Sequence, residues 1–92
     1  MIRLENRNAN HFKFYEFHGI EQNGRFIVKG IYGRIGQVGQ ETVIYDGTDK
    51  AEANKEFERK KNEKLKKGYN VVMRGGQTVE APEEKKRLLI FL

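Results

Sequence analysis

An aromatic ring, a glycine and an arginine follow one another at Tyr32, Gly33 and Arg34. This order puts a flat stacking surface beside a forked cation, and the glycine lets the backbone bend or approach a partner closely. A sugar-phosphate surface suits the combination, because the ring can pack on a sugar or base while the guanidinium binds phosphate. In β-rich proteins the same three residues more often form a buried ring, a bend and a solvated charge. Both interpretations stay open at this point.

Three β-strands are expected around this segment, at residues 11–18, 25–31 and 41–45. Aromatic residues on both faces of the first strand predict that it is central in a sheet or covered on both sides. The Asn-Gly pair at 23–24 predicts a hairpin turn, since both positions tolerate positive φ. Gly30 suggests a bulge or a kink in the second strand. A glycine-rich loop is expected between the second and third strands, at Gly33, Gly36 and Gly39.

One long helix is expected at residues 49–67. Asp49 can cap its start with Glu52 as a capping-box partner, and Gly68 ends it. The apolar positions of this helix are few, namely Ala53, Phe57 and Leu65. The core that the helix can build with a sheet is therefore small.

Basic residues crowd the second half of this helix, among them Lys60, Lys64 and Lys67. One cause is general, because cations stabilise a helix C-terminus. Glu56–Lys60 and Glu63–Lys67 also have the spacing of ordinary ion pairs. The alternative is that the lysines form an edge that faces nucleic acid, and the sequence leaves the two equally open.

These elements predict an α+β fold, with a small antiparallel sheet of three to five strands and one long helix packed on one face. Val71 to Met73 add a short strand, and residues 83–92 form either a helix opened by Pro82 or an apolar strand. The expected organisation is a polar arm at residues 1–10 and one domain at 11–92. Within that domain, residues 12–70 are the core and 71–92 a C-terminal extension.

The composition favours a polyanionic partner and gives little support to catalysis. The 92 residues carry a formal net charge of +5, as expected of a protein that binds nucleic acid. The sequence has no serine and no cysteine, which excludes a Ser or Cys nucleophile with a histidine base. His11 and His18 lack neighbours at metal-ligand spacing, and the glycines match neither the dinucleotide fingerprint nor the P-loop. We therefore expect a binding protein rather than an enzyme, with no cofactor, metal or small-molecule substrate.

No apolar run approaches the roughly 18 residues that a membrane-spanning helix needs. The N-terminal residues do not resemble a signal peptide. The expectation is a cytoplasmic protein with no membrane partner.

An ordered set of short motifs resembles the WGR domain, a module named for a Trp-Gly-Arg at this place. The motifs are Lys13 to Glu16, Gly24 to Phe26, Tyr32 to Gly36, Gly39 with Gln40, a helix with Ala53, Phe57 and Lys64, and Lys67 to Tyr69. The resemblance covers about residues 12–70. It implies a free-standing WGR module with Tyr-Gly-Arg in place of Trp-Gly-Arg, without the ADP-ribosyl transferase domain of poly(ADP-ribose) polymerases.

In those polymerases the module helps detect DNA breaks, with its Trp against the terminal nucleotide and its Arg coupling the module to its neighbours. The resemblance carries these roles to Tyr32 and Arg34, and a phosphate contact to Lys13. Tyr in place of Trp predicts weaker stacking than the roughly 1–3 kcal/mol typical of base–aromatic contacts. Phe12 stands where the family often has an end-sensing Asn. Lys61 stands where the family helix often has an aromatic residue, which predicts a smaller core.

The first hypothesis for function is a module that binds the backbone or the ends of a nucleic acid, with DNA favoured. The expected site residues are Tyr32, Gly33, Arg34, Lys13, Lys60, Lys64 and Lys67. The alternative is a protein-interaction or homodimerisation module with no nucleic-acid role. Its contact would be the Tyr-Gly-Arg surface or the apolar run that begins at Leu88 and ends at Leu92.

Overall fold

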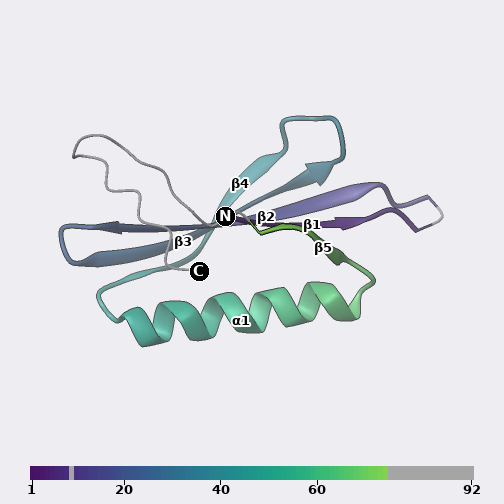
Figure 1. The fold of residues 1–92 in the computed structure, drawn as a ribbon. Coiled ribbons are helices and arrows are strands. Elements are labelled where there is room, and N and C mark those ends of the chain that lie inside the picture. Colours follow the sequence, from purple (N-terminus) through teal and green to yellow (C-terminus); the bar gives the residue numbers. More distant parts are fainter. Residues whose placement is uncertain (9, 75–92) are drawn as a thin grey trace.

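The computed structural model describes residues 1–8 and 10–74. Its elements in chain order are β1 (Ile2–Asn6), β2 (Lys13–Gln22), β3 (Arg25–Arg34), β4 (Gln40–Gly47), α1 (Lys50–Lys66) and β5 (Asn70–Arg74). The strands form one antiparallel sheet in the order β4-β3-β2-β1-β5, and α1 runs along one face of it (Figure 1). The predicted α+β fold, with a small antiparallel sheet and one long helix, is confirmed.

The expectation of a loose polar arm at residues 1–10 is wrong, because residues 2–6 form β1 between β2 and β5. Ile2 and Leu4 are buried in the core that faces α1. Asn6 is buried as well, and its side-chain amide donates a hydrogen bond to the carbonyl oxygen of Lys67 at 3.2 Å. The alternation of buried and partly exposed residues in β1 is the period of two that a strand requires.

The hairpin of β2 and β3 is longer than expected. Its turn is the predicted one, with φ of 52° at Asn23 and 79° at Gly24. Both strands have ten residues, so β3 runs past position 31 and includes the Tyr-Gly-Arg segment. The prediction that this segment lies in a loop is therefore wrong. The loop begins after Arg34, and the functional candidates stand on the end of a strand.

The core lies between the sheet and α1. Its buried residues are Ile2, Leu4, Tyr15, Phe17, Val28, Ala53 and Phe57. Phe57 of α1 meets Phe17 of β2 edge to face, with ring centroids 5.1 Å apart. Lys61 covers the same ring, since its Nζ lies 5.3 Å from the centroid of Phe57. The lysine amine thus lies over the ring at the position where the family often has an aromatic residue.

The helix begins at the predicted cap, Asp49, but the capping-box partner differs from the prediction. The side chain of Asp49 accepts hydrogen bonds from the backbone N–H groups of Ala51 and Glu52. The backbone N–H of Asp49 donates to the hydroxyl oxygen of Tyr45 at 3.2 Å, in the role expected of the Glu52 carboxylate. A contact from Tyr45 near the end of β4, four residues before Asp49, therefore replaces the capping box.

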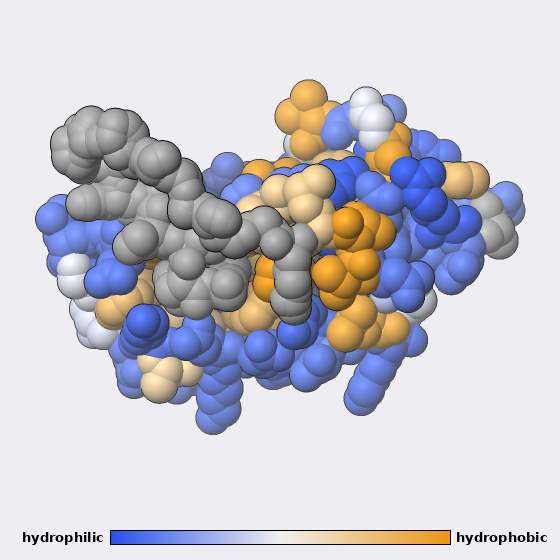
Figure 2. All heavy atoms as spheres, in the orientation of Figure 1, coloured by the Kyte–Doolittle hydropathy of each residue, from blue (hydrophilic) through white to orange (hydrophobic). Residues whose placement is uncertain are grey.

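The predicted strand at Val71 to Met73 is confirmed as part of β5. These three side chains are exposed, and Figure 2 shows hydrophobic residues gathered over the place of β5. The run from Leu88 to Leu92, and the choice of helix or strand for residues 83–92, lie outside the described residues. In the described part of the chain, no helix is both long and apolar enough to cross a membrane.

Candidate nucleic-acid interface

Tyr32 is held by a row of rings that crosses the sheet. Tyr15 of β2 lies opposite Tyr32 in the register of the hairpin, and the two rings stack at 5.6 Å with an interplanar angle of 12°. Tyr15 packs in turn on Phe17 in the core, with centroids 4.9 Å apart. Tyr15 is only 3% exposed, whereas Tyr32 is 38% exposed. The core thus fixes one side of Tyr32 and leaves part of the residue open to a ligand.

Gly30 provides the space in which Tyr15 lies. A Cβ atom at position 30 would stand 2.6 Å from the hydroxyl oxygen of Tyr15, so the tyrosine reaches over β3 at this point. The predicted irregularity is not at Gly30 itself, because the register between β3 and β4 shifts between Val28 and Lys29. Gly30 therefore serves the packing of Tyr15.

Gly33 allows a close approach of backbone, and the partner is the loop that follows β3. A Cβ at Gly33 would lie 2.9 Å from the Cα of Gly39, which itself has a φ of 86°. The loop is also tied to the start of β2, since the N–H of Ile35 donates to the carbonyl oxygen of Phe12 at 2.9 Å. The glycine of the Tyr-Gly-Arg segment thus lets the loop fold back beside the site.

A pocket of about 430 Å³ opens beside Tyr32. We call it the arginine-side pocket; its strand residues are Lys13, Phe14, Tyr15, Tyr32, Gly33 and Arg34. Lys64 of α1 and Tyr69 complete its lining. Five of the seven predicted site residues lie together here: Lys13, Tyr32, Gly33, Arg34 and Lys64.

The cations of the arginine-side pocket have no carboxylate partners among residues 1–8 and 10–74. Lys13 and Arg34 are exposed and stand opposite each other in the register of β2 and β3. Lys64 contacts rings instead of carboxylates, with its Nζ 4.9 Å from the centroid of Tyr15 and 5.6 Å from that of Tyr69. No salt bridge to a described carboxylate is formed by these three cations, and only Glu63 acts on Lys64 from outside salt-bridge distance, so the cluster keeps a net positive charge.

The pKa of Lys64 reflects this crowding. Burial lowers the pKa below its ordinary 10.5, and the positive charges of Lys60, Lys67 and Lys13 lower it further against the opposing effect of Glu63. An anion at this place would remove the repulsion, because it favours the charged form of the amine.

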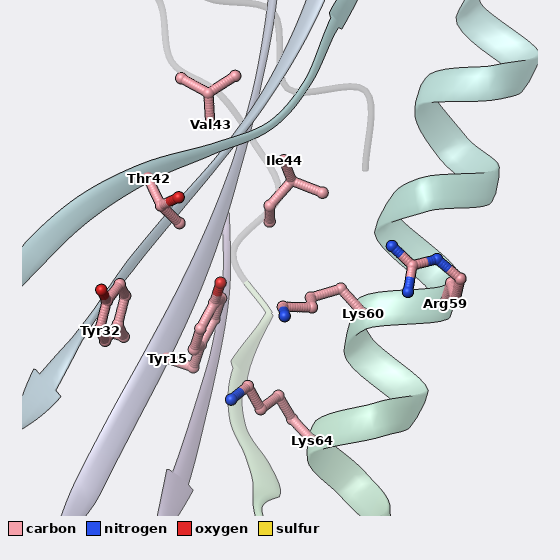
Figure 3. A pocket seen from close by; sticks show the side chains of 8 residues that line it. All are labelled: Tyr15, Tyr32, Thr42, Val43, Ile44, Arg59, Lys60 and Lys64. Carbon is pink, nitrogen blue, oxygen red and sulfur yellow. The ribbon is translucent and has the colours of Figure 1, made fainter.

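A second pocket, of about 310 Å³, lies on the other side of Tyr32, between the sheet and α1 (Figure 3). We call it the helix-side pocket; its strand residues are Tyr15, Tyr32, Thr42, Val43 and Ile44. Arg59, Lys60 and Lys64 line it from the helix, and Figure 3 shows both lysine amines directed toward the strands. Lys60 is partly compensated, since its Nζ lies 3.6 Å from a carboxylate oxygen of Glu63.

Lys67 lines neither of these two pockets. It lines a third pocket, of about 480 Å³, on the helix with Arg59, Asn62, Glu63 and Lys66. Its Nζ lies 3.7 Å from Glu63, so the predicted Glu63–Lys67 pair is present. The predicted Glu56–Lys60 pair is wrong, because Glu56 pairs with Arg59 at 2.8 Å and Lys60 with Glu63. Lys67 therefore lies outside both pockets that Tyr32 lines.

Among the polar and charged residues of the two pockets, sequence reasoning missed Tyr15, Thr42, Arg59 and Tyr69. Tyr15 had a signal, because a two-residue turn at Asn23 and Gly24 fixes the hairpin register and places Tyr15 opposite Tyr32. The other three depend on how β4, α1 and the helix C-terminus pack, which no local pattern gives. Within the described ranges 1–8 and 10–74, no three His, Asp or Glu residues group closely enough to hold a metal ion.

The family comparison covers the elements that build this surface. A family model described as the WGR domain matches residues 1–76, which includes β1 and β5 as well as the expected 12–70. Comparisons with curated proteins and with solved structures found no match. Because the family match spans most of the 92 residues and includes every described strand and the helix, this chain belongs to the WGR domain family.

Proposed function

We propose that this WGR domain binds nucleic acid, with DNA favoured, through the arginine-side pocket and the exposed part of Tyr32. WGR domains are modules of a nucleic-acid-binding type in poly(ADP-ribose) polymerases. The observation that carries the proposal for this chain is the set of three cations, Lys13, Arg34 and Lys64, around a half-exposed ring. None of the three has a carboxylate partner in the described part of the chain.

Each part of the pocket has a role that suits a sugar-phosphate chain. Arg34 can bind two phosphate oxygens at once with its planar fork, and Lys13 supplies a compact charge beside it. Tyr32 offers its exposed part to a sugar or a base, while the stack on Tyr15 keeps the ring from turning away. Such contacts engage the backbone and position the protein without reading sequence.

The proposed role is binding rather than catalysis. The sequence holds no serine or cysteine nucleophile, and the pocket gathers cations and rings rather than an acid and a base. The alternative of a protein partner rests on tyrosine and arginine as residues that also concentrate binding energy in protein interfaces. The experiment below separates the two.

Fluorescence anisotropy of a labelled nicked duplex tests the proposal, with blunt 5′-phosphorylated duplex and closed-circular DNA as competitors. Tyr32→Ala and Arg34→Gln should each weaken binding by roughly 1–3 kcal/mol, about 5- to 150-fold. The matched control is Lys55→Gln, which removes one charge from the exposed surface of α1 outside the three pockets. It should change affinity less than about twofold, since a distant charge acts only through the screened field.

Two results would contradict the proposal. One is wild-type protein that binds no DNA at 50 mM salt. The other is equal loss of affinity in Arg34→Gln and Lys55→Gln, which would mean that only net charge matters. If closed-circular DNA competes as strongly as the duplexes that have ends, the protein contacts the DNA backbone and not its ends.

A further inference from the structure

The hydroxyl of Tyr15 is a hydrogen-bond donor on a buried residue. Tyr15 is 3% exposed, and its hydroxyl has no hydrogen-bond partner among the residues that the structure describes. Burial raises the pKa of Tyr15 to about 12, so the group keeps its proton at neutral pH. Buried polar groups are nearly always hydrogen-bonded in proteins, and one without a partner needs an explanation.

Figure 3 shows where this hydroxyl points. It is directed into the helix-side pocket, toward the space between Thr42 and Lys60. The side chain of Thr42 has no hydrogen-bond partner within the described residues either, and its hydroxyl can also donate. Two side chains with hydroxyl groups therefore line the strand side of the pocket, one on β2 and one on β4 (Figure 3).

The opposite wall is positively charged. Arg59 donates from Nε and Nη2 to one oxygen of Glu56, at 3.1 and 2.8 Å, which leaves the other N–H groups of its fork available. Lys60 shares Glu63 with Lys67, and Lys64 has no described carboxylate partner. The cations of the pocket thus outnumber the carboxylates that compensate them.

We propose that the helix-side pocket is a phosphate subsite, separate from the Lys13 and Arg34 contact, which binds the phosphate of a nucleotide. A phosphate oxygen accepts from the Tyr15 and Thr42 hydroxyls while the amines of Lys60 and Lys64 balance its charge. The volume of about 310 Å³ is at the lower end of small-ligand sites, and it suits one such group rather than a long ligand.

The nucleotide can come from two sources with the same chemistry. Tyr32 lines both pockets, so one strand can place consecutive phosphates in the two pockets. A free mononucleotide presents the same phosphate without a strand. The inference therefore goes beyond the proposed function, because the subsite needs only a phosphate and not a nucleic acid.

The test uses two probes, deoxythymidine 5′-monophosphate and a 5′-phosphorylated octathymidylate. Binding is followed by the shifts of backbone amide signals in NMR titrations. Tyr15→Phe keeps the ring stack and removes only the hydroxyl, and it should weaken binding of at least one probe about tenfold, as expected for a lost hydrogen bond to a charged group. Its midpoint of urea unfolding should be equal to or higher than that of wild type, since the lost hydroxyl has no described partner.

Tyr45→Phe is the matched control. It removes a hydroxyl that lies outside both pockets and accepts the N–H of Asp49. This variant should lose stability and bind both probes as wild type does. The opposite response of the two variants separates a ligand contact from a structural hydroxyl.

The outcomes also separate this inference from the proposed function. Loss of octathymidylate affinity in Tyr15→Phe supports the subsite with a strand as its source, and loss for the monophosphate alone supports it with a free nucleotide. If Arg34→Gln weakens the binding of octathymidylate but Tyr15→Phe binds it as tightly as wild type does, the subsite is overturned and the proposed function stands. If neither probe binds the wild-type protein, the subsite is overturned as well.

Discussion

Tyr32 combines a fixed position with partial exposure, and both come from its neighbour Tyr15. The stack on Tyr15 at 5.6 Å anchors the ring to the core, and the hydroxyl of Tyr32 donates to the side-chain oxygen of Gln40 at 3.3 Å. A ring fixed before binding loses little entropy when a ligand packs on it. The site is therefore pre-organised at the residue that the proposal needs most.

Substitutions at Tyr32 should rank by ring size. Tyr32→Phe keeps the ring and should retain most of the DNA affinity, Tyr32→Trp should raise the affinity, and Tyr32→Ala should lose roughly 1–3 kcal/mol of binding free energy. Anisotropy titrations of one nicked duplex against all four proteins give the ranking. If Tyr32→Ala binds as tightly as wild type, stacking on the Tyr32 ring does not contribute to DNA affinity.

Lys64 should make the affinity depend on pH. Its pKa is lowered by burial and by Lys60, Lys67 and Lys13, whereas bound phosphate favours the charged amine and raises the pKa again. Affinity should be full below the lowered pKa of the free protein and fall as the pH rises through it toward 10.5. Titrations between pH 7 and pH 10 measure this fall.

Lys64→Arg is the control for this prediction, because arginine stays charged throughout the range. Its affinity should change much less with pH. A wild-type profile as flat as that of Lys64→Arg would mean that the amine does not contact the anion.

The residues of the site differ in how far the sequence could predict them. Tyr32, Gly33, Arg34 and Lys13 follow from a local motif and from a hairpin register that the turn fixes. The helix lysines do not, because Lys60, Lys64 and Lys67 have similar local patterns. Only the rotation and the position of α1 against the sheet separate Lys64, in the arginine-side pocket, from Lys67, outside it.

Gly30, in the middle of β3, leaves the space in which Tyr15 packs beneath the site. Gly30→Ala places a methyl group 2.6 Å from the hydroxyl oxygen of Tyr15, where the tyrosine ring is packed between β3 and the core. Such overpacking should cost about 1–3 kcal/mol of unfolding free energy and displace Tyr15, which also weakens DNA binding. Urea unfolding and anisotropy measure the two effects.

Thr42→Ala is the comparison for unfolding stability only, since Thr42 pairs with Gly30 across β3 and β4 and the change adds no atoms. It should leave the stacked rings in place. Gly30→Ala with wild-type stability and wild-type DNA affinity would show that the tyrosine has room to move, contrary to the packing described here.

The strands show where local sequence patterns are not sufficient to predict the structure. The turn at Asn23 and Gly24 and the cap at Asp49 follow from backbone and side-chain preferences, and both are present. The extension of β3 to Arg34 depends on cross-strand pairing with Lys13 and Phe14, which overrides the glycine at position 33. β1 has a strand pattern of only five residues, and its pairing on both sides decides its place in the sheet.

At the level of the whole molecule, the face of the sheet away from α1 is covered by a polar network. Arg3 lies 4.4 Å above the ring of Phe14 and donates to Glu16 at 2.7 Å and to Glu5 at 2.9 Å. His18 lies 3.0 Å from the other oxygen of Glu16. The network gives the carboxylates of Glu5 and Glu16 hydrogen-bond partners on the face where the ring of Phe14 is buried.

Acid should destabilise the protein through this network. Burial alone would raise the pKa values of Glu16 and Glu5, but the hydrogen bonds to Glu16 from His18 and Arg3 and to Glu5 from Arg3 and Arg7 lower both below 4.5. The stabilisation is full above pH 4.5, the value of the unfolded chain, and is lost as the pH falls through the lowered folded values. Urea midpoints at pH 6 and pH 3 should differ less in Glu16→Gln than in wild type; an equal difference would contradict the role of Glu16.

The distribution of ion pairs over the molecule is the basis of the functional proposal. Arg3, Arg7, Arg25 and Lys29 are each paired with a carboxylate on the sheet. Lys13, Arg34 and Lys64 have no such partner within the described residues, although they lie close together. A cluster of like charges destabilises the free protein, so its presence beside an exposed ring supports the proposal of a polyanion site.

The salt dependence of DNA affinity tests this claim most directly. With three phosphate contacts, the slope of log K against log salt should be about −3 for the wild type, and about one unit shallower for Arg34→Gln. Lys55→Gln should keep the wild-type slope. A wild-type slope near zero, or an Arg34→Gln slope equal to that of the wild type, would contradict the account.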